Sequence, residues 1–338
     1  MSAANAQTAP PMTVQRVKFE AAPPVYTVPL GIALESLPYP RPVSFLDLEN
    51  GGQPVRMAYM DSAPVGLPAG AIARTPVLLL HGKNFYGAYW ANTITALNAA
   101  GYRVIVPDQI GFGKSSKPDM TYSFDLLAAN TIKLLDSLGV SKISVVGHSM
   151  GGMLAARLAL NYPQRVEKLV LEDPIGLEDY HAATGPVSDE TLYENELGET
   201  DVEKIRANFK NYFVTWKPEY ERFVEVRERI TLSGEWPRAA KASALTYQMI
   251  LRQPVVYQLP MIQTPTLIVI GLSDRTAVGR NYAPPAVAAT LGNYPVLGKR
   301  AAQAMPRAQL LELPNVGHIP HLEAPEPFHR ALIRFLQR

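Results

Sequence analysis

The chain has 338 residues, and none of them is cysteine. This absence excludes a thiol nucleophile, a disulfide framework and a thiolate metal site. Long hydrophobic runs are also absent, because no apolar stretch approaches the roughly 20 residues that a transmembrane helix needs. The six histidines lack carboxylate-rich surroundings with metal-ligand spacing, and His318 and His321 form their closest pair. We therefore expect neither a membrane span nor a metal site.

An excess of charge of one sign is missing as well. The chain carries 32 lysines and arginines against 30 aspartates and glutamates, and charged residues make up only 18% of it. Because these charges are interspersed without a basic cluster, we expect no nucleic-acid partner. Hydrophobic residues account for 47% of the chain, which is enough for one large core or for a core domain with a subdomain.

The N-terminal residues 1–40 are rich in proline and predict an arm that lies over the surface rather than a domain. Within this arm, Ala4-Asn5-Ala6 resembles the end of a secretory signal whose apolar part is missing. One interpretation is therefore a periplasmic or secreted protein. The alternative is the ordinary N-terminus of a cytoplasmic protein.

Short apolar runs alternate with helical patterns along most of the chain. A hairpin is predicted first, over 43–61, because two alternating runs flank Asn50-Gly51-Gly52. Six short runs with apolar centres suit parallel strands buried on both faces: 75–82, 102–108, 142–149, 166–173, 264–271 and 308–314. Helical patterns follow at 123–139, 149–163 and 326–338, the first with Ser123 as N-cap. Such alternation predicts an α/β fold with helices on both faces of a mostly parallel sheet.

The alternation breaks once, between residues 175 and 255, where no buried strand is predicted. The stretch 200–230 within it places charged and aromatic residues at helical spacing, which indicates a helical insertion. We therefore expect a core made of 41–174 and 256–338, interrupted by the helical segment 175–255.

Ser149 is the candidate nucleophile. It stands in the sequence Gly147-His-Ser-Met-Gly151, between a predicted strand and a predicted helix. A nucleophile elbow needs this strand–turn–helix context, and the flanking glycines keep side chains out of the crowded turn. The alternative is a packing turn with an idle serine.

His318 is the candidate base, because a serine hydroxyl needs a neighbouring group to take its proton. It lies in a loop after the last predicted strand, where loops return to the carboxyl edge of the sheet. His321 is expected to pack or to form hydrogen bonds within the same turn. The orienting carboxylate is predicted to be Asp274, which follows a strand, with Asp173 as its competitor.

The oxyanion of an acyl-transfer intermediate needs preorganised donors. The backbone N–H of Met150 is one candidate, because it follows the nucleophile. The second is expected from the loop after 75–82, where Lys83 is preferred and Asn84 is a further candidate through its amide or side chain. The alternative for the Lys83 side chain is a solvated surface charge.

Five motifs, in this order, resemble those of the α/β-hydrolase fold superfamily over residues 45–338. They are HG after the first buried strand, D-x-x-G-x-G-x-S after the second, G-H-S-M-G-G after the third, G-x-x-D after a late strand and G-H-x-P-H-x-E-x-P-E near the end. Three segments look closer to bacterial lipase- and esterase-like serine hydrolases: LLLHGKNF, DQIGFGKSSKP and DPIGLEDY. The resemblance implies a helical cap at 175–255 and activity without a cofactor.

Residue types set some relatives aside. Haloalkane dehalogenases and epoxide hydrolases have aspartate at the position of Ser149, and proline iminopeptidases usually have tryptophan at the position of Met150. The carbon–carbon bond hydrolases of aromatic breakdown share the S-M-G-G elbow but have asparagine at the position of His148. Perhydrolases share the expected triad.

The predicted function is that of a serine hydrolase that cleaves small or medium hydrophobic carboxylic esters through an acyl-enzyme. Its expected partner is a small-molecule ester. Aromatic side chains of the insertion either roof this ester or pack the insertion against the core: Phe209, Tyr212, Phe213 and Trp216. A carbon–carbon bond hydrolase or a perhydrolase is the alternative within the same chemistry. A ligand-binding protein on a hydrolase fold is the alternative outside it.

Overall fold

A mixed sheet of eight strands organises the computed structural model, which describes residues 24–64, 66 and 74–338. The strand order is β1-β2-β4-β3-β5-β6-β7-β8, antiparallel from β1 to β4 and parallel from β4 onward. The strands are β1 (Val43–Asn50), β2 (Gln53–Ser62), β3 (Val77–Leu80), β4 (Val104–Pro107), β5 (Ile143–His148), β6 (Val166–Glu172), β7 (Thr266–Gly271) and β8 (Ala308–Leu313). The predicted α/β class and mostly parallel sheet are confirmed.

The hairpin of β1 and β2 turns where the sequence predicts it. Asn50 pairs with Gln53, and the two residues between them, Gly51 and Gly52, have φ angles of 58° and 73°. Glycine is favoured there because a tight hairpin turn of this kind needs positive φ at both central residues.

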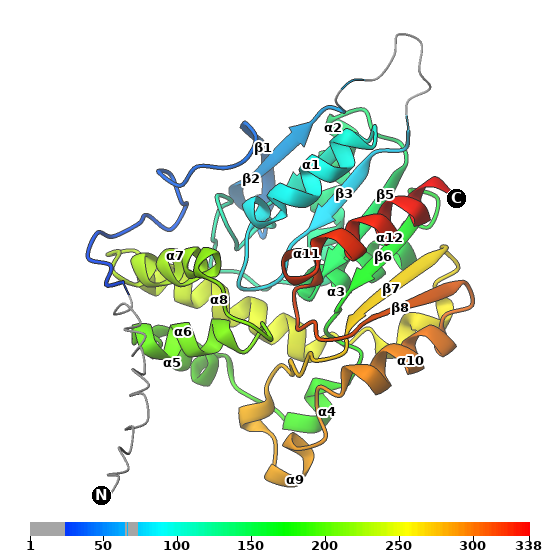
Figure 1. The fold of residues 1–338 in the computed structure, drawn as a ribbon. Helices are drawn as coiled ribbons and strands as arrows, with labels where there is room; N and C mark the ends of the chain where they lie inside the picture. The colour runs from blue at the N-terminus through cyan, green and yellow to red at the C-terminus, as the bar shows by residue number, and fades with distance from the viewer. Residues whose placement is uncertain (1–23, 65, 67–73) are drawn as a thin grey trace, which may run out of the picture.

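Helices cover both faces of the sheet (Figure 1). On β3, Val77 and Leu79 belong to one hydrophobic core cluster, while Leu78 and Leu80 belong to the other, as the period of two in a strand requires. The first cluster includes side chains of α1 (Ala91–Ala99) and α12 (Pro325–Gln337). The second includes side chains of α2 (Phe124–Ser137), α3 (Met150–Asn161) and α10 (Tyr294–Ala304).

The ends of α2 and α3 match their sequence signals. The Ser123 side chain accepts a hydrogen bond from the backbone N–H of Leu126 at 3.1 Å, so the predicted N-cap of α2 is confirmed. Helix α3 begins at Met150, directly after the candidate nucleophile. This start aims the N-terminal end of α3 at the carboxyl edge of the sheet.

Between β6 and β7 the chain forms a group of helices. They are α4 (Tyr180–Thr184), α5 (Asp189–Gly198), α6 (Val202–Lys210), α7 (Glu221–Thr231) and α8 (Trp236–Arg252). Figure 1 shows α5 to α8 lying together beside the sheet, at the left of the view. Short helices complete the structure: η1 (Gly87–Trp90), η2 (Pro218–Tyr220), η3 (Val256–Met261), η4 (Arg280–Tyr282), α9 (Pro285–Ala288) and α11 (Pro320–Glu323).

Residues 24–42, which we call the strap, run from these helices to β1 (Figure 1, dark blue). The N–H of Leu30 donates to the carbonyl oxygen of Arg229 in α7 at 2.8 Å, and the Tyr39 hydroxyl donates to Asp108 Oδ2, after β4, at 2.6 Å. The strap is therefore fixed to both the helical group and the sheet. The rest of the predicted arm, including Ala4-Asn5-Ala6, lies outside the described residues.

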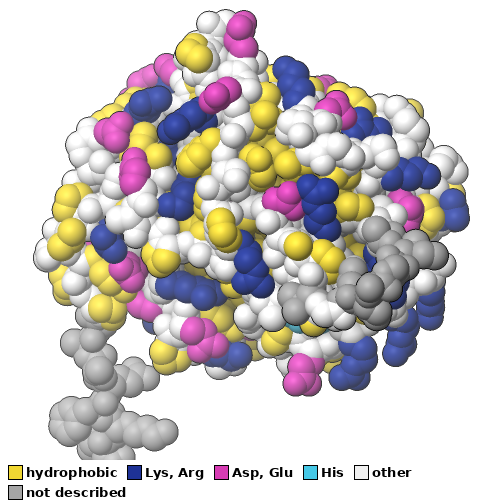
Figure 2. All heavy atoms as spheres, turned by 90° about the horizontal axis from the view of Figure 1, so that it is seen from above, with side chains coloured by type: hydrophobic (Ala, Val, Ile, Leu, Met, Phe, Trp, Pro, Cys, Tyr) yellow, Lys and Arg dark blue, Asp and Glu magenta, His cyan; other side chains and the backbone are white. Residues whose placement is uncertain are grey.

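The surface is mixed in charge. Figure 2 shows lysine and arginine interspersed with aspartate and glutamate over the face in view. In the residues that the structure describes, no helix is both long enough and apolar enough to span a bilayer.

Candidate active site

Ser149 occupies a strained turn between β5 and α3. Its φ and ψ are 56° and −120°, a backbone conformation that residues other than glycine rarely adopt. The turn is held by a hydrogen bond from its backbone N–H to the carbonyl oxygen of Glu172 at the end of β6, at 3.1 Å. Such strain, at the carboxyl edge of a parallel sheet, is typical of a nucleophile elbow.

The glycines on either side of Ser149 allow close backbone approach. A Cβ atom added to Gly147 would lie 2.1 Å from the carbonyl oxygen of Gly151, and one added to Gly151 would lie 2.2 Å from that of Leu80. Either distance is shorter than any real contact. The spacing G-x-S-x-G is thus a steric requirement of this turn.

Three residues that are far apart in the sequence form one hydrogen-bonded line at this edge. His318 Nε2 lies 3.0 Å from Ser149 Oγ, and His318 Nδ1 lies 2.7 Å from Asp274 Oδ2. All three residues are buried. Because the aspartate accepts from Nδ1–H, Nε2 is left free to accept the serine proton.

Asp274 is positioned by the turn after β7. Its N–H donates to the carbonyl oxygen of Gly271 at 3.0 Å, and its Oδ1 accepts from the N–H of Thr276 at 2.7 Å. A Cβ atom on Gly271 would lie 2.0 Å from the carbonyl oxygen of Gly317, so glycine lets the aspartate turn approach the loop that carries His318.

Asp173, the competing carboxylate, lies beside this site but has different partners. Its two carboxyl oxygens accept from the N–H of Gly271 at 3.0 and 3.1 Å, and no hydrogen bond joins it to His318 in the described structure. Burial, together with the nearby charge of Asp274, raises the pKa of Asp173 well above its usual range. The structure therefore brings Asp274, and not Asp173, to the candidate base.

The expected oxyanion donors lie near Ser149. Met150 is the first residue of α3, so its N–H has no intrahelical acceptor. A Cβ atom on Gly82 would lie 3.2 Å from Ser149 Cβ, and the N–H of Lys83 belongs to the next peptide unit along that loop. The structure therefore places the N–H of Met150 directly after the serine and brings the loop that carries Lys83 beside it.

The side chains of Lys83 and Asn84 point to other partners. Lys83 Nζ lies 2.8 Å from Glu196 Oε1 and 2.8 Å from Ser243 Oγ, so the alternative of a solvated surface charge does not hold. The helices between β6 and β7 bury this ammonium, which the sequence pattern could not indicate. Asn84 Nδ2 donates to the Tyr212 hydroxyl at 2.7 Å.

No local sequence pattern indicates the further set of hydrogen bonds that lies behind the serine. The N–H of Gly82 donates to the Tyr89 hydroxyl at 3.0 Å, and that hydroxyl lies 3.0 Å from His148 Nδ1. His148 Nε2 lies 2.7 Å from the carbonyl oxygen of His318. Since a carbonyl only accepts, Nε2 carries the proton and Nδ1 accepts from the tyrosine. Burial, with the neighbouring His318 and His321, lowers the pKa of His148 well below its usual range, which keeps this tautomer neutral.

His321 belongs to a buried pair with Glu172. Its backbone N–H donates to Glu172 Oε1 at 2.7 Å, and its Nδ1 lies 3.0 Å from the same oxygen. The imidazole stacks on Trp90, with ring centroids 4.1 Å apart. This agrees with the expectation that His321 packs and forms hydrogen bonds, and it anchors the loop of His318 to the end of β6.

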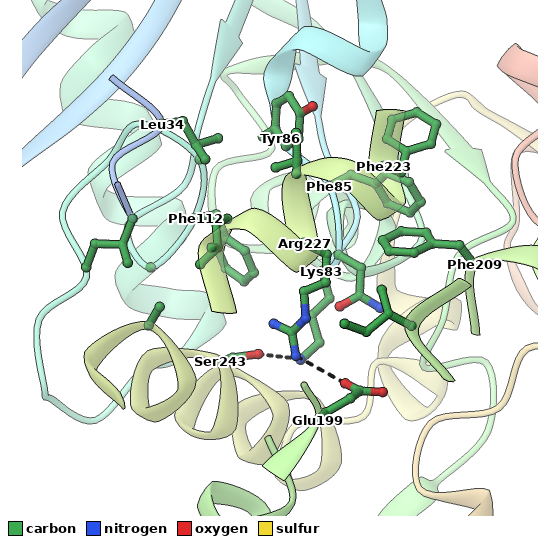
Figure 3. Close-up of a pocket in the computed structure, with 18 of the residues that line it drawn as sticks. Leu34, Lys83, Phe85, Tyr86, Phe112, Glu199, Phe209, Phe223, Arg227 and Ser243 are labelled. Atoms are coloured by element: carbon green, nitrogen blue, oxygen red, sulfur yellow. Dashed lines mark hydrogen bonds and ion pairs between the residues drawn. The ribbon is translucent and has the colours of Figure 1, made fainter. Parts of the chain in front are cut away.

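A cavity of about 140 Å³ adjoins the candidate site (Figure 3). Lys83, Asn84 and Tyr212 line it, and Tyr212 also lies next to the candidate base. The backbone carbonyl oxygen of Tyr212 accepts from the N–H of His318 at 2.8 Å, and the centroids of the two rings are 5.3 Å apart. The apolar lining comprises Ile32, Leu34, Phe85, Tyr86, Phe112, Ile205, Phe209, Phe223, Val226, Ile230, Trp236 and Ala239. The cavity thus offers a largely apolar space beside the candidate nucleophile.

Of the four aromatic residues expected to roof the site, Phe209 and Tyr212 line this cavity. Phe213 and Trp216 are not among its described lining residues. Phe213 instead stacks on Tyr220, with centroids 3.9 Å apart, and Trp216 packs edge-on against the same tyrosine. For these two the structure agrees with the packing alternative, because α6 ends at Lys210 and both residues lie in the connection that leads to η2.

Charged groups of the cavity wall are paired with one another. Lys83 bonds Glu196, and Arg227 bonds both Glu196 and Glu199 at 3.1 Å. Lys117 also contributes to the lining, and its Nζ donates to the carbonyl oxygens of Gly113 and Ser115. No group of three or more potential metal ligands occurs among the residues described.

Comparisons with known proteins agree with this architecture. A family described as alpha/beta hydrolase fold matches residues 75–325. The crystal structure of a probable hydrolytic enzyme from Pseudomonas aeruginosa PAO1 has 48% sequence identity and a TM-score of 0.88, covering 92% of this chain and 99% of its own.

Two curated relatives are named for different activities. A 2-hydroxy-6-oxo-6-phenylhexa-2,4-dienoate hydrolase from Burkholderia cepacia is 30% identical over 272 residues, 77% of this chain and 87% of that protein. Lipase 1 from Psychrobacter immobilis is 32% identical over 267 residues, 75% of this chain and 74% of that protein.

Proposed function

Because the chain belongs to the alpha/beta hydrolase fold family, we propose that this hydrolase cleaves carboxylic esters through an acyl-enzyme formed on Ser149. The observation that carries the proposal is the line from Ser149 Oγ to His318 Nε2, at 3.0 Å, and from His318 Nδ1 to Asp274 Oδ2, at 2.7 Å. A hydroxyl, a base and an orienting carboxylate at these distances are the elements of nucleophilic acyl transfer.

In the first half-reaction, His318 Nε2 takes the proton of Ser149 as the oxygen attacks the acyl carbonyl. The negative charge that develops on the carbonyl oxygen is held by the N–H groups of Met150 and Lys83. The C–O bond of the ester then breaks, and His318 gives its proton to the departing alcohol. Asp274 stabilises the imidazolium while it exists.

In the second half-reaction, water replaces the alcohol. His318 takes a proton from this water as it attacks the acyl-enzyme, and the same N–H groups hold the second oxyanion. Collapse of the intermediate returns the proton to Ser149 and releases the carboxylic acid. The protein groups described are sufficient for each of these proton transfers.

The cavity supports an ester without net charge, with hydrophobic parts of small or medium size. Its wall is largely apolar, which favours binding of hydrocarbon. Lys83 and Arg227 are each bonded to a glutamate, so their charges are already balanced. Burial opposes ionisation of Glu196, but the charges of Lys83 and Arg227 prevail and lower its pKa to about 2, so this pairing is maintained at neutral pH.

A second candidate is hydrolysis of a carbon–carbon bond next to a carbonyl. The relative from Burkholderia cepacia, named as a dienoate hydrolase, favours it. A dienoate substrate carries a carboxylate, which requires a cation that is not already neutralised. Among the described residues of the cavity wall, Lys117 is the one cation without a carboxylate bonded to it, so it is the candidate for binding the carboxylate of a dienoate. Burial lowers the pKa of Lys117 to about 8.

The experiment compares p-nitrophenyl esters, from acetate to laurate, with 2-hydroxy-6-oxo-6-phenylhexa-2,4-dienoate, using the natural protein and Ser149→Ala. We expect ester hydrolysis that Ser149→Ala reduces at least about 10⁴-fold. Ser137→Ala, at an exposed position near the end of α2, is the matched control and should keep full activity.

Two outcomes would overturn the proposal. Cleavage of the dienoate without cleavage of any ester would favour the second candidate. Ester hydrolysis by Ser149→Ala at the natural rate would remove Ser149 from the reaction. Circular dichroism and the midpoint of thermal unfolding establish that each variant is folded.

A further inference from the structure

Two residues of the cavity wall, Ile32 and Leu34, come from the strap and not from the segment that matches the family. We propose that Leu34 determines which acyl chain lengths the cavity accepts, so that the strap is a specificity element of the active site. This inference rests on the proposed ester hydrolysis for its substrate class. It assigns a role to a segment that precedes the hydrolase sheet.

The strap is fixed where it crosses the cavity. On one side the N–H of Leu30 donates to the carbonyl oxygen of Arg229, and Arg229 Nε donates to the carbonyl oxygen of Val28 at 2.9 Å. On the other side Tyr39 bonds Asp108, and Lys114 Nζ donates to the carbonyl oxygen of Leu34. Leu34 is thus held between α7 and the loop after β4, rather than resting on an open surface.

Leu34 has a backbone conformation that leucine rarely adopts. Its φ is 53°, in the left-handed region, where the Cβ atom of any residue other than glycine is crowded. Hydrogen bonds from the N–H of Leu34 to Gly31, at 2.9 Å, and from the N–H of Leu37 to Leu34, at 3.0 Å, build the turn that imposes it. Strain of this kind persists where the surroundings determine the conformation, and it gathers at functional sites.

The strained residue is buried against the cavity. Leu34 is 2% exposed and packs in one hydrophobic cluster with Tyr86 and Val226, which also line the cavity. Figure 3 shows Leu34 on the side of Tyr86 and Phe112, away from Glu199. Lys83 and Tyr212, by contrast, form the part of the wall next to Ser149 and His318. Leu34 therefore limits the apolar space that an acyl chain fills.

Shortening Leu34 should lengthen the acyl chain that is accepted. In an apolar pocket, one methylene group changes substrate discrimination by roughly 10-fold or more. We expect Leu34→Ala to raise the ratio of kcat/KM for p-nitrophenyl decanoate to that for the butyrate by at least about 10-fold. Leu34→Gly should raise the same ratio of kcat/KM values. Because glycine adopts positive φ without strain, this second variant tests the inference even if Leu34→Ala does not fold.

Leu30→Ala is the matched control. Leu30 is also 2% exposed and belongs to the same hydrophobic cluster, but it is not among the described residues that line the cavity. Loosening of the strap alone would give Leu30→Ala and Leu34→Ala the same chain-length profile. Equal profiles, or a profile of Leu34→Ala unchanged from the natural protein, would overturn the inference.

A binding measurement separates this inference from the proposed function. Calorimetric titration with 1-alkanols, from hexanol to dodecanol, reports the apolar space without any turnover. If the natural protein hydrolyses no ester, the proposed function fails, but the inference still requires Leu34→Ala to favour longer alkanols than the natural protein does. A common alkanol preference for the natural protein, Leu30→Ala and Leu34→Ala would overturn the inference even if esters are cleaved.

Discussion

The backbone carbonyl oxygen of His318 accepts a hydrogen bond from Nε2 of His148, at 2.7 Å. The residue before the proposed nucleophile therefore holds the loop that carries the proposed base. Through Tyr89, the same imidazole is connected to Gly82 in the loop of the proposed oxyanion donor. One buried, neutral side chain links three parts of the site that come from separate segments of the chain.

Replacement of His148 by alanine should lower kcat for ester hydrolysis about 100-fold and leave KM nearly unchanged. The reason is that both loops lose a positioning contact, and a small misplacement of reacting groups costs about this factor. Steady-state kinetics on the best p-nitrophenyl ester give the two constants.

Tyr89→Phe serves as a comparison for His148, because it removes only the hydroxyl between Gly82 and the imidazole. It should lower kcat less than His148→Ala does, and His148→Gln should recover part of the loss by donating to the His318 carbonyl. A fall in stability without any change in kcat would show that His148 is structural only.

Asp274→Asn and Asp173→Asn should differ sharply in activity. Asp274→Asn replaces the carboxylate with a neutral amide, whose NH₂ group favours the wrong tautomer of His318 and cannot stabilise the imidazolium. This should lower kcat about 10⁴-fold. Asp173 bonds the N–H of Gly271 instead, so its Asn variant should lose less than about 10-fold. Steady-state rates of both variants against one ester provide the measurement. The reverse ranking would assign the orienting role to Asp173.

Stability should respond to pH through Asp173. Its folded-state pKa is raised by burial and by Asp274, so its contribution to stability is complete below the unfolded pKa of about 3.9 and is lost as pH rises through the folded value. Between these two pKa values the natural protein should lose up to about 1.4 kcal/mol per pH unit relative to Asp173→Asn. Urea unfolding of both proteins at several pH values gives this difference, and a pH-independent difference would contradict the raised pKa.

The ammonium group of Lys83 should matter for stability more than for chemistry. Lys83→Met leaves Glu196 with one cation fewer, which should lower the free energy of unfolding by about 2 kcal/mol. Because the proposed oxyanion donor is the backbone N–H, kcat should change by less than about 10-fold. Urea unfolding and ester kinetics test both expectations, with Lys142→Met, at an exposed position, as control. A loss of several hundred-fold in kcat without loss of stability would instead place the ammonium group at the oxyanion.

Local signals were sufficient to predict most of the sheet and several helices. The apolar run 142–149 became β5 over Ile143–His148, and the pattern 123–139 became α2 over Phe124–Ser137, because burial and capping act on neighbouring residues. The segment Gly87–Ala99, which forms η1 and α1, was not predicted. Its alanines, threonines and asparagines give a weak apolar pattern, and packing against the sheet stabilises it instead.

The proposed triad could be assembled from the sequence because each member follows a predicted strand, and parallel strands end at one edge. The contacts of His148 could not, since its partners Tyr89 and His318 lie far away in the sequence and no local pattern records them. Leu34 is a similar case. A leucine in a proline-rich arm carries no sign of a cavity that α7, α8 and the loop after β4 complete.

The position of the strap has a consequence for the order of events during synthesis. The strap is synthesised about 200 residues before α7, and because Leu30 bonds Arg229 and Arg229 in turn bonds Val28, neither contact can form until α7 has been made. Until then the apolar side chains of Leu30, Ile32 and Leu34 remain in water. Contacts over such a sequence distance form slowly and leave apolar surface exposed meanwhile. The strap thus reaches its native position only after a segment that is synthesised well behind it.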